Sequence, residues 1–289
     1  MPPLLKLLLT RVGMWPKSSR SMVIAGTVII VVVLALDAYA HIVGLTPFAT
    51  SYQVLSPPSF AHVMGTDQIG RDIFSRASFG TTFSLLVAFV SVIISVGVGS
   101  VTGAFSGFFG GKIDRVTSLA FDALYALPPL IIAILIAAMI GPGIVNTGLA
   151  IGIGYMPQYF RVVRGIILSI KERPFIESTR AIGAGYGTLI FHHMIPYAIP
   201  SIIALMTLNM GSGVVDVAGL GFLGLGLPPP TPEWGTDLGR GRDFITSGAW
   251  WPSTFPGLMI VMSVLGFTLL GQGLDEVFRS TSTKQKEKF

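Results

Sequence analysis

The sequence contains no cysteine among its 289 residues. This absence excludes disulfides, thiolate metal sites and a cysteine nucleophile. Charge is scarce as well, because Asp, Glu, Lys and Arg together make up 11% of the chain, whereas a soluble globular protein carries about 25%. So little charge cannot cover a water-facing surface. Together with a mean hydropathy of +0.73, it predicts a protein embedded in a lipid bilayer.

Catalytic motifs are missing too. The sequence has no Gly-x-x-x-x-Gly-Lys-Ser/Thr loop to cradle phosphate, no nucleophile elbow and no His-Glu-x-x-His pattern. His41, His62, His192 and His193 lack the spacing of a metal site, since the last two are adjacent and would point to different faces of a helix. We therefore expect no enzymatic activity, no cofactor and no metal in this chain.

Long apolar runs dominate what is present. A helix needs about 20 apolar residues to cross a bilayer, and six stretches qualify: 22–42, 83–105, 117–140, 147–168, 197–226 and 254–274. The predicted fold class is an all-α membrane protein with six transmembrane helices. Pro128-Pro129 predicts a kink in the third, and glycines at 211–213 or 219–226 predict a break in the fifth.

The first of these runs could be a secretory signal instead. Basic residues precede it, and Ala38-Tyr39-Ala40 looks like a cleavage site. However, the apolar run extends to about residue 43, beyond the roughly 7–15 residues of a signal peptide. We expect a retained first span and keep a removed signal as the alternative.

The positions of lysine and arginine predict the orientation. With the N-terminus in the cytoplasm, only Arg71, Arg76, Arg240 and Arg242 of the 19 basic residues fall in outer loops, as the positive-inside rule requires. This distribution marks a membrane face and argues against nucleic-acid binding. The predicted organisation is a cytoplasmic segment (1–21), a first helix with its outer loop (22–82), a five-helix core (83–279) and a disordered cytoplasmic tail (280–289).

The interval of about 170–196, between the fourth and fifth spans, is polar. Pro174 suits the first turn of a helix, and Glu177 is favoured there by the helix dipole. Gly183 follows six positions later, and Pro196 closes the interval. The pattern predicts a short helix parallel to the membrane that projects into the cytoplasm and fits a partner. An ordinary polar loop is the alternative.

This interval resembles the cytoplasmic coupling loop of bacterial ABC-importer permeases, with Ser178 and Thr179 where that family usually has Ala-Ala. Asp216 also departs, since the family often has Glu there. Further motifs resemble the C-type member of the oligopeptide/dipeptide/nickel permease branch. They are Gly-Thr-Asp at 65–67, Gly-Arg-Asp at 70–72, Gly-Phe-Phe-Gly-Gly-Lys-Ile-Asp-Arg at 107–115, Gly-Phe-Leu-Gly-Leu-Gly at 221–226, Pro-Pro-Thr-Pro-Glu-Trp-Gly at 229–235, Phe-Pro-Gly at 255–257 and Leu-Gly-Gln-Gly-Leu at 270–274.

The resemblance implies a multi-pass subunit of the bacterial inner membrane that forms half of a pathway for peptides. Its implied partners are a second, B-type permease, two cytoplasmic ATPases that bind ATP and Mg, and an extracytoplasmic binding protein. The implied ATPase-coupling residues are Glu177, Ser178, Arg180, Ala181, Gly183 and Gly185. The alternative is a secondary transporter or channel that works without ATPases, although such folds favour inverted repeats and charges near the midplane.

The two long outer loops contain similar strings, at 65–72 and 235–243. Ile69, Ile73 and Ala77 fall at helical spacing, which predicts a short amphipathic helix on the outer interface. A repeated turn-and-cap pattern without a shared role is the alternative. The candidate contacts for the binding protein are Asp67, Arg71, Asp72, Asp237 and Arg240.

Some polar residues interrupt the apolar runs. Asp37, Asp122 and Asp216 lie near predicted span ends, so we expect solvation at the interface rather than a proton relay. Asn209 and Gln158 lie deeper. They are candidates for lining the pathway, or for joining helices by hydrogen bonds.

Overall fold

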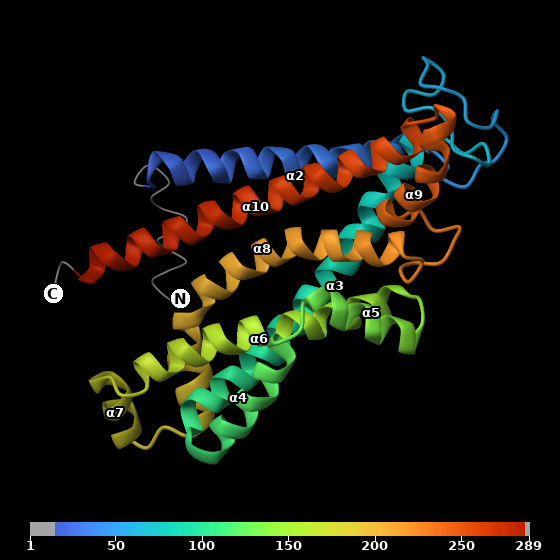
Figure 1. The fold of residues 1–289 in the computed structure, drawn as a ribbon. Coiled ribbons are helices and arrows are strands. Elements are labelled where there is room, and N and C mark those ends of the chain that lie inside the picture. The colour runs from blue at the N-terminus through green and yellow to red at the C-terminus, as the bar shows by residue number, and fades with distance from the viewer. Residues whose placement is uncertain (1–14, 287–289) are drawn as a thin grey trace.

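The structure, a computed structural model, describes residues 15–286. Regular secondary structure in that range is helical, apart from an isolated bridge between Thr66 and Asp72 (Figure 1). The elements in chain order are α2 (Lys17–Val43), α3 (Ile73–Phe109), α4 (Gly111–Tyr125), α5 (Pro129–Ile140), α6 (Ile144–Ile170), α7 (Pro174–Ala181), the π-helix η2 (Thr188–Met194), α8 (Ile195–Phe222), α9 (Trp234–Gly241), the 3₁₀ helix η3 (Arg242–Ser247) and α10 (Trp251–Lys286).

The long helices run between two ends of the molecule. In Figure 1, the start of α2, the C-terminal end of α10 and the short helix α7 lie at the left. The loop of residues 44–72, α9 and η3 gather at the opposite end. We call these the α7 end and the α9 end. The predicted short helix therefore lies at the same end of the molecule as both ends of the described chain.

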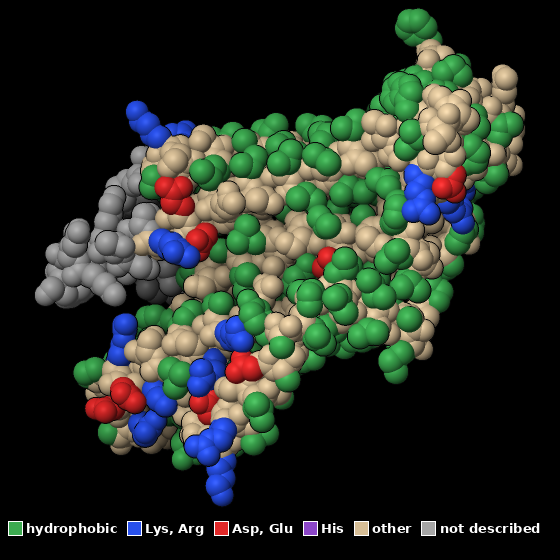
Figure 2. Space-filling view, viewed as in Figure 1, with side chains coloured by type: hydrophobic (Ala, Val, Ile, Leu, Met, Phe, Trp, Pro, Cys, Tyr) green, Lys and Arg blue, Asp and Glu red, His purple; other side chains and the backbone are tan. Residues whose placement is uncertain are grey.

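Membrane-spanning character is clear for most of the long helices. Within the described range, α2, α3, α10 and the continuous η2–α8 helix are long and apolar enough to cross a membrane, and α4 with α5 makes a fifth candidate if the bent pair counts as one span. Hydrophobic side chains cover much of the molecule between its ends, whereas charged side chains gather near the ends (Figure 2). The 27-residue α6 covers the predicted fourth span but is not among these candidates.

The third predicted span is broken where its proline pair lies. α4 and α5 meet at 89°, with Pro128 preceding α5 and Pro129 as its first residue. Proline cannot donate the backbone hydrogen bond that would continue α4. The predicted kink is thus confirmed at this position, where the span is divided into two helices nearly at right angles. α5, with 12 residues, is about 18 Å long, which is shorter than the hydrocarbon core of about 30 Å.

α3 and α6 pack in parallel along a seam of glycines. A Cβ atom at Gly99 would lie 2.5 Å from the carbonyl oxygen of Met156, and one at Gly103 would lie 2.5 Å from that of Phe160. Ser95 donates a hydrogen bond of 2.8 Å to the carbonyl of Gly152 across the same seam. Small residues at four-residue spacing let two membrane helices approach backbone to backbone, so α3 and α6 are tightly joined.

A second glycine seam joins α2 to α10. A Cβ atom at Gly26 would lie 2.6 Å from the carbonyl oxygen of Gly266, and one at Gly273 would lie 2.6 Å from the side chain of Val23. The two helices are antiparallel and side by side in Figure 1. α2 and α10 are therefore tightly joined along this seam.

Several sequence expectations are wrong in detail. α8 has no break at 211–213, whereas the alternative site at 219–226 is right, because α8 ends at Phe222 and the chain turns at Gly224, whose φ is +79°. The expected amphipathic helix around residue 69 is absent, because Ile73 and Ala77 are buried in the first turns of α3. The expected disordered tail is helical up to Lys286. Residues 287–289 and the basic residues Lys6 and Arg11 lie outside the described range.

Candidate functional site

α7 forms as the sequence predicts. Arg173 is extended, Pro174 is the first helical residue, and Glu177 lies in the first turn. Proline loses nothing at this position, where its missing N–H would have no partner in the helix. The hydroxyls of Ser178 and Thr179 donate to backbone carbonyls one turn earlier, at 2.9 and 2.7 Å.

Gly183 ends α7 by turning the backbone to a φ of +90°. Its N–H donates to the carbonyl of Arg180 at 3.0 Å, and the N–H of Ala184 donates to that of Thr179 at 3.3 Å. This pair of bonds is the Schellman arrangement, which satisfies the last carbonyls of a helix and favours glycine. The sequence identified Gly183 by its spacing, and the structure gives the physical reason for glycine there.

The predicted coupling residues share one property, which is exposure to solvent. This holds for Glu177, Ser178, Arg180, Ala181, Gly183 and Gly185. Apolar side chains lie among them, since Ile182 is 86% exposed and Tyr186 is 62% exposed. The guanidinium of Arg180 lies 5.9 Å from the centre of the Phe108 ring at the end of α3. α7 and the residues after it therefore present a mixed polar and apolar surface that residues 15–286 leave uncovered.

A buried anchor fixes this exposed surface to the bundle. Ile176 is the buried residue of α7, with no exposed area. It belongs to a core at the α7 end that draws on α3, α6, η2 and α8: Ala104, Val163, Ile167, Ile170, Ile176, Leu189, Ile190, Met194, Ala198 and Ile202. The π-helix η2 supplies three of these residues and leads directly into α8. Force on α7 would thus reach three long helices through one packed core.

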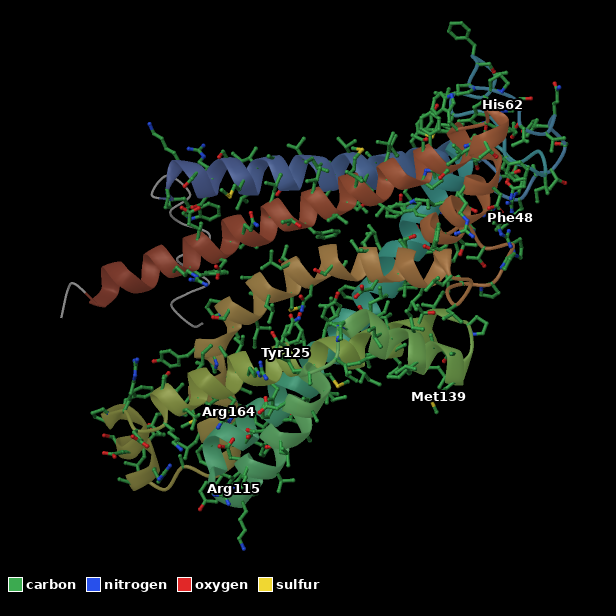
Figure 3. All side chains as sticks on the ribbon, in the orientation of Figure 1. Phe48, His62, Arg115, Tyr125, Met139 and Arg164 are labelled. Carbon is green, nitrogen blue, oxygen red and sulfur yellow. The ribbon has the colours of Figure 1, made fainter. Side chains whose placement is uncertain are left out.

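An ion pair strengthens the same end. Arg164, near the end of α6, places both Nε and Nη2 on the carboxylate of Asp114 in the first turn of α4, at 2.5 and 2.7 Å. Ser106 of α3 donates to the same carboxylate. Figure 3 shows Arg164 beside α4, with Arg115 at the edge of the molecule. The chain turns tightly at Gly110 and Gly111, whose φ values are +66° and +58°, and the Asp114 carboxylate ties this turn to α6.

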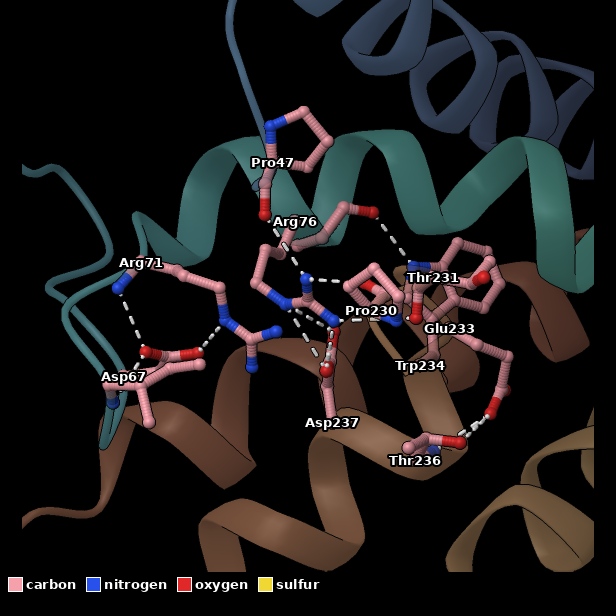
Figure 4. A network of polar contacts seen from close by, with 12 residues as sticks. Pro47, Asp67, Arg71, Arg76, Pro230, Thr231, Glu233, Trp234, Thr236 and Asp237 are labelled. Carbon is pink, nitrogen blue, oxygen red and sulfur yellow. Dashed lines mark hydrogen bonds and ion pairs between the residues drawn. The ribbon is translucent and has the colours of Figure 1, made fainter. Parts of the chain in front are cut away.

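A network of buried charges holds the α9 end together (Figure 4). The Nη2 atom of Arg76 lies 2.6 Å from Oδ1 of Asp237 in α9, and its Nε lies 3.1 Å from Oδ2. Nη1 donates to the carbonyls of Pro47 and Pro230 at 3.1 and 3.2 Å. Burial raises the pKa of the Asp237 carboxyl, and the neighbouring Arg76 opposes this shift. One arginine thus joins three segments that are distant in sequence.

The first loop is closed by its own charges. Asp67 accepts a 2.6 Å hydrogen bond from Nε of Arg71, and both side chains are buried. Asp72 caps α3 through Ser75 N–H at 2.8 Å and contacts His62 at 2.8 Å. The turn-and-cap alternative is therefore right for this string. The similar string at 235–243 differs, because it forms α9 and the start of η3.

Four of the five candidate receptor contacts consequently have internal partners. Asp67 and Arg71 pair with each other, Asp72 caps a helix, and Asp237 pairs with Arg76. Among them, only the Arg240 side chain has no hydrogen bond or ion pair within residues 15–286. Receptor contact stays a prediction, and Arg240 is the residue of this set that is best available for it.

Sequence reasoning missed Glu233 and Trp234, which are both fully buried. The Glu233 carboxylate caps α9 by accepting from the N–H groups of Gly235 and Thr236 at 2.7 and 2.8 Å. Burial raises the pKa of Glu233, and these hydrogen bonds oppose the shift. Trp234 donates to the carbonyl of Ala77 at 2.8 Å. A Glu-Trp pair after a proline-rich stretch was the available signal.

Polar side chains meet between α6 and α8 inside the apolar region. The Asn209 amide donates to Gln158 and to the Tyr159 hydroxyl, both at 3.2 Å, so these residues do join helices. Tyr155 donates to Asp216 at 2.6 Å. Asp216 is 8% exposed, and the expectation that it is solvated at an interface is wrong.

The other two acids differ from Asp216. Asp122 is exposed as expected and pairs with Arg161 at 2.7 Å. Asp37 accepts a 2.8 Å hydrogen bond from Thr82, which joins α2 to α3.

Comparison with known proteins decides the family. The binding-protein-dependent transport system inner membrane component family matches residues 99–281, which include α7 and the core that anchors it. The chain belongs to this family. The resemblance of its motifs to ABC-importer permeases is thereby confirmed, and the alternative of an ATPase-independent transporter finds no support.

Individual relatives agree. The chain is 38% identical over 253 residues to the dipeptide transport system permease protein DppC of Alkalihalophilus pseudofirmus, covering 87% of this chain and 83% of that protein. It is 40% identical over 227 residues to the di/tripeptide transport system permease protein DppC of Pseudomonas aeruginosa, covering 76% and 75%. It is 39% identical over 217 residues to the glutathione transport system permease protein GsiD of Pectobacterium atrosepticum, covering 75% and 72%.

The fold is also similar to that of a solved transporter chain. A chain of the MetNI methionine ABC transporter superposes with a TM-score of 0.54 and 20% identity, covering 70% of this chain and 94% of that chain. At this identity the similarity concerns the fold alone.

Proposed function

We propose that this protein is the C-type permease subunit of a bacterial ABC importer for peptides, and that ATPases drive it through α7. The observation that carries the proposal is the construction of α7. Its coupling residues are exposed, while Ile176 is fully buried in a core shared with α3, α6 and α8. A short rigid projection of this kind transmits a push, whereas a flexible loop would absorb it.

The proposed topology has six spans and a cytoplasmic α7 end. α4 and α5 together form the third span, and α6 forms the fourth, with its polar residues Thr147, Tyr155 and Tyr159 buried against other helices. The basic residues support this orientation, since Lys112, Arg115, Lys171, Arg173 and Arg180 all flank the α7 end, and cytoplasmic segments of membrane proteins are rich in lysine and arginine.

The proposed partners follow from the family. A second, B-type permease completes the pathway, two cytoplasmic ATPases bind ATP and Mg and contact α7, and an extracytoplasmic binding protein delivers substrate at the α9 end. The subunit itself then needs no cofactor, because the hydrolysis takes place in the ATPases.

Peptides are the proposed substrate class. Two of the relatives reported above are named for dipeptides or di- and tripeptides, and the third for glutathione, itself a tripeptide. Gln158 borders a cavity of about 300 Å³ at the break between α4 and α5, together with Tyr125 and Gly154. Asn209 orients this amide. Tyr125 lies midway between the ends in Figure 3, so we assign Gln158, supported by Asn209, to the pathway wall.

A reconstituted complex tests the proposal. The permease, its B-type partner, the ATPases and the binding protein are placed in proteoliposomes, and uptake of labelled di- and tripeptides is measured with and without ATP. Glu177→Lys should abolish uptake while the complex still assembles, because it reverses a charge on the exposed face of α7. Glu172→Lys is the matched control, since Glu172 is also exposed but precedes the helix. Full uptake by Glu177→Lys, or purification without any ATPase, contradicts the proposal.

A further inference from the structure

A cavity of about 380 Å³ opens at the α9 end. Its walls are the C-terminal end of α8, the following loop, α9, and Pro142 between α5 and α6. Most of the lining is backbone, glycine, proline or apolar side chain, and Arg240 and Asp243 supply the charges. Sites for small ligands have this character, with volumes of about 300–1,000 Å³ and few charged groups.

The two charged groups of the cavity differ in whether they have an ion-pair partner. Asp243 is engaged by Arg242, whose Nε lies 3.3 Å from Oδ1, and the Arg242 guanidinium also stacks 4.5 Å from the centre of the Phe222 ring. Asp237, the acid within α9, is held by Arg76. Arg240 therefore points to no acid within residues 15–286, although it is half-buried.

An arginine at the edge of this cavity, with no acidic partner among the described residues, favours one kind of ligand group. Its planar fork of N–H donors matches a carboxylate with two parallel hydrogen bonds. A partly desolvated site strengthens that contact relative to bulk water. Every peptide with a free C-terminus carries such a carboxylate, whatever its side chains.

We infer that Arg240 binds the C-terminal carboxylate of the peptide in this cavity, as the first contact of substrate with this subunit. The inference rests on the proposed peptide import and on the α9 end facing the delivering side. It explains how one subunit can accept peptides of varied sequence, because the recognised group belongs to the main chain. The glycine-rich and proline-rich walls fit this reading, since they present backbone rather than sequence-selective side chains.

Direct binding of two matched probes tests the inference. The complete permease–ATPase complex is placed in lipid nanodiscs without the binding protein. Binding of trialanine and of trialanine amide is then followed by ligand-detected NMR. The two probes differ only in the charge of the C-terminus. We expect the wild-type complex to bind trialanine about tenfold or more tightly than the amide, and Arg240→Gln to remove this difference by weakening trialanine alone. Arg240→Lys should keep part of it.

Arg115→Gln is the control, because Arg115 is an exposed arginine at the α7 end, away from the cavity. It should leave the preference for the free acid unchanged. If Arg240→Gln weakens both probes equally, or neither, or if the wild-type complex binds both alike, the inference is overturned. In proteoliposomes, reduced uptake of both probes by Arg240→Gln, with unchanged binding in nanodiscs, would instead assign Arg240 to a contact with a carboxylate of the binding protein. This outcome also overturns the inference. Failure of the proposed function is seen separately, as absence of ATP-driven peptide uptake by the wild-type proteoliposomes.

Discussion

Truncation of Ile176 to alanine tests whether α7 works as a rigid projection. Ile176 has no exposed area and is the buried residue of an eight-residue helix. Helices this short are unstable in water on their own, so packing of this side chain holds α7 against the bundle. Removing a buried isoleucine side chain down to alanine costs about 2–5 kcal/mol. Even at the lower limit, the undocked population of α7 rises about 30-fold.

The expected result is uncoupling rather than loss of the complex. In proteoliposomes, Ile176→Ala should hydrolyse ATP while moving much less peptide per ATP, and amide exchange across 174–185 should accelerate. Ile176→Val costs only about 0.5–1.5 kcal/mol and should stay close to wild type. Ile182→Ala is a second control, since this side chain is 86% exposed and its loss alters the contact surface without undocking α7. Normal coupling together with normal exchange in Ile176→Ala would refute the rigid-projection argument.

Two further predictions concern the framework. Gly103→Leu should prevent stable insertion or assembly, because even its Cβ would lie 2.5 Å from a carbonyl oxygen of α6. Gly97→Leu should be tolerated, because nothing lies within 4 Å of its Cβ position. The amount of complex purified from membranes distinguishes the two variants, and equal yields would contradict the close packing of α3 on α6. Arg76→Gln leaves the buried carboxylate of Asp237 unpaired, so it should destabilise the α9 end by about 3–5 kcal/mol. The thermal unfolding midpoint in detergent should fall, and proteolysis of the loop 44–72 should be faster. An unchanged midpoint would contradict a stabilising role for the network.

Local signals in the sequence predicted α7 and its ends well. Pro174 and Glu177 mark a helix start, and Gly183 marks a helix end, because each acts through the backbone within one or two turns. The kink at Pro128 was equally predictable, for the same reason. The family resemblance supplied the expected partner of α7, an ATPase, since spacing alone cannot say what a short exposed helix contacts.

The rest depends on contacts between distant segments, which no local pattern reveals. Arg71 and Asp237 look like surface charges in their loops, yet they are buried because other segments supply partners for them. Asp216 lies near a span end in sequence, but Tyr155 on another helix meets it. A polar residue near a boundary is ambiguous until its neighbours in space are known, and this is why the internal partners of four of the five candidate receptor contacts were not foreseen.

The length of α3 has a mechanical consequence. This single helix of 37 residues is about 55 Å long. It begins among the charges around Arg76 and finishes beside the Phe108 ring that Arg180 approaches. If it swings about its midpoint as a stiff beam, a tilt of about 5° displaces its two tips by about 2 Å in opposite directions. The pathway would then open on one side of the membrane and close on the other in a single rigid-body tilt of α3, without separate steps.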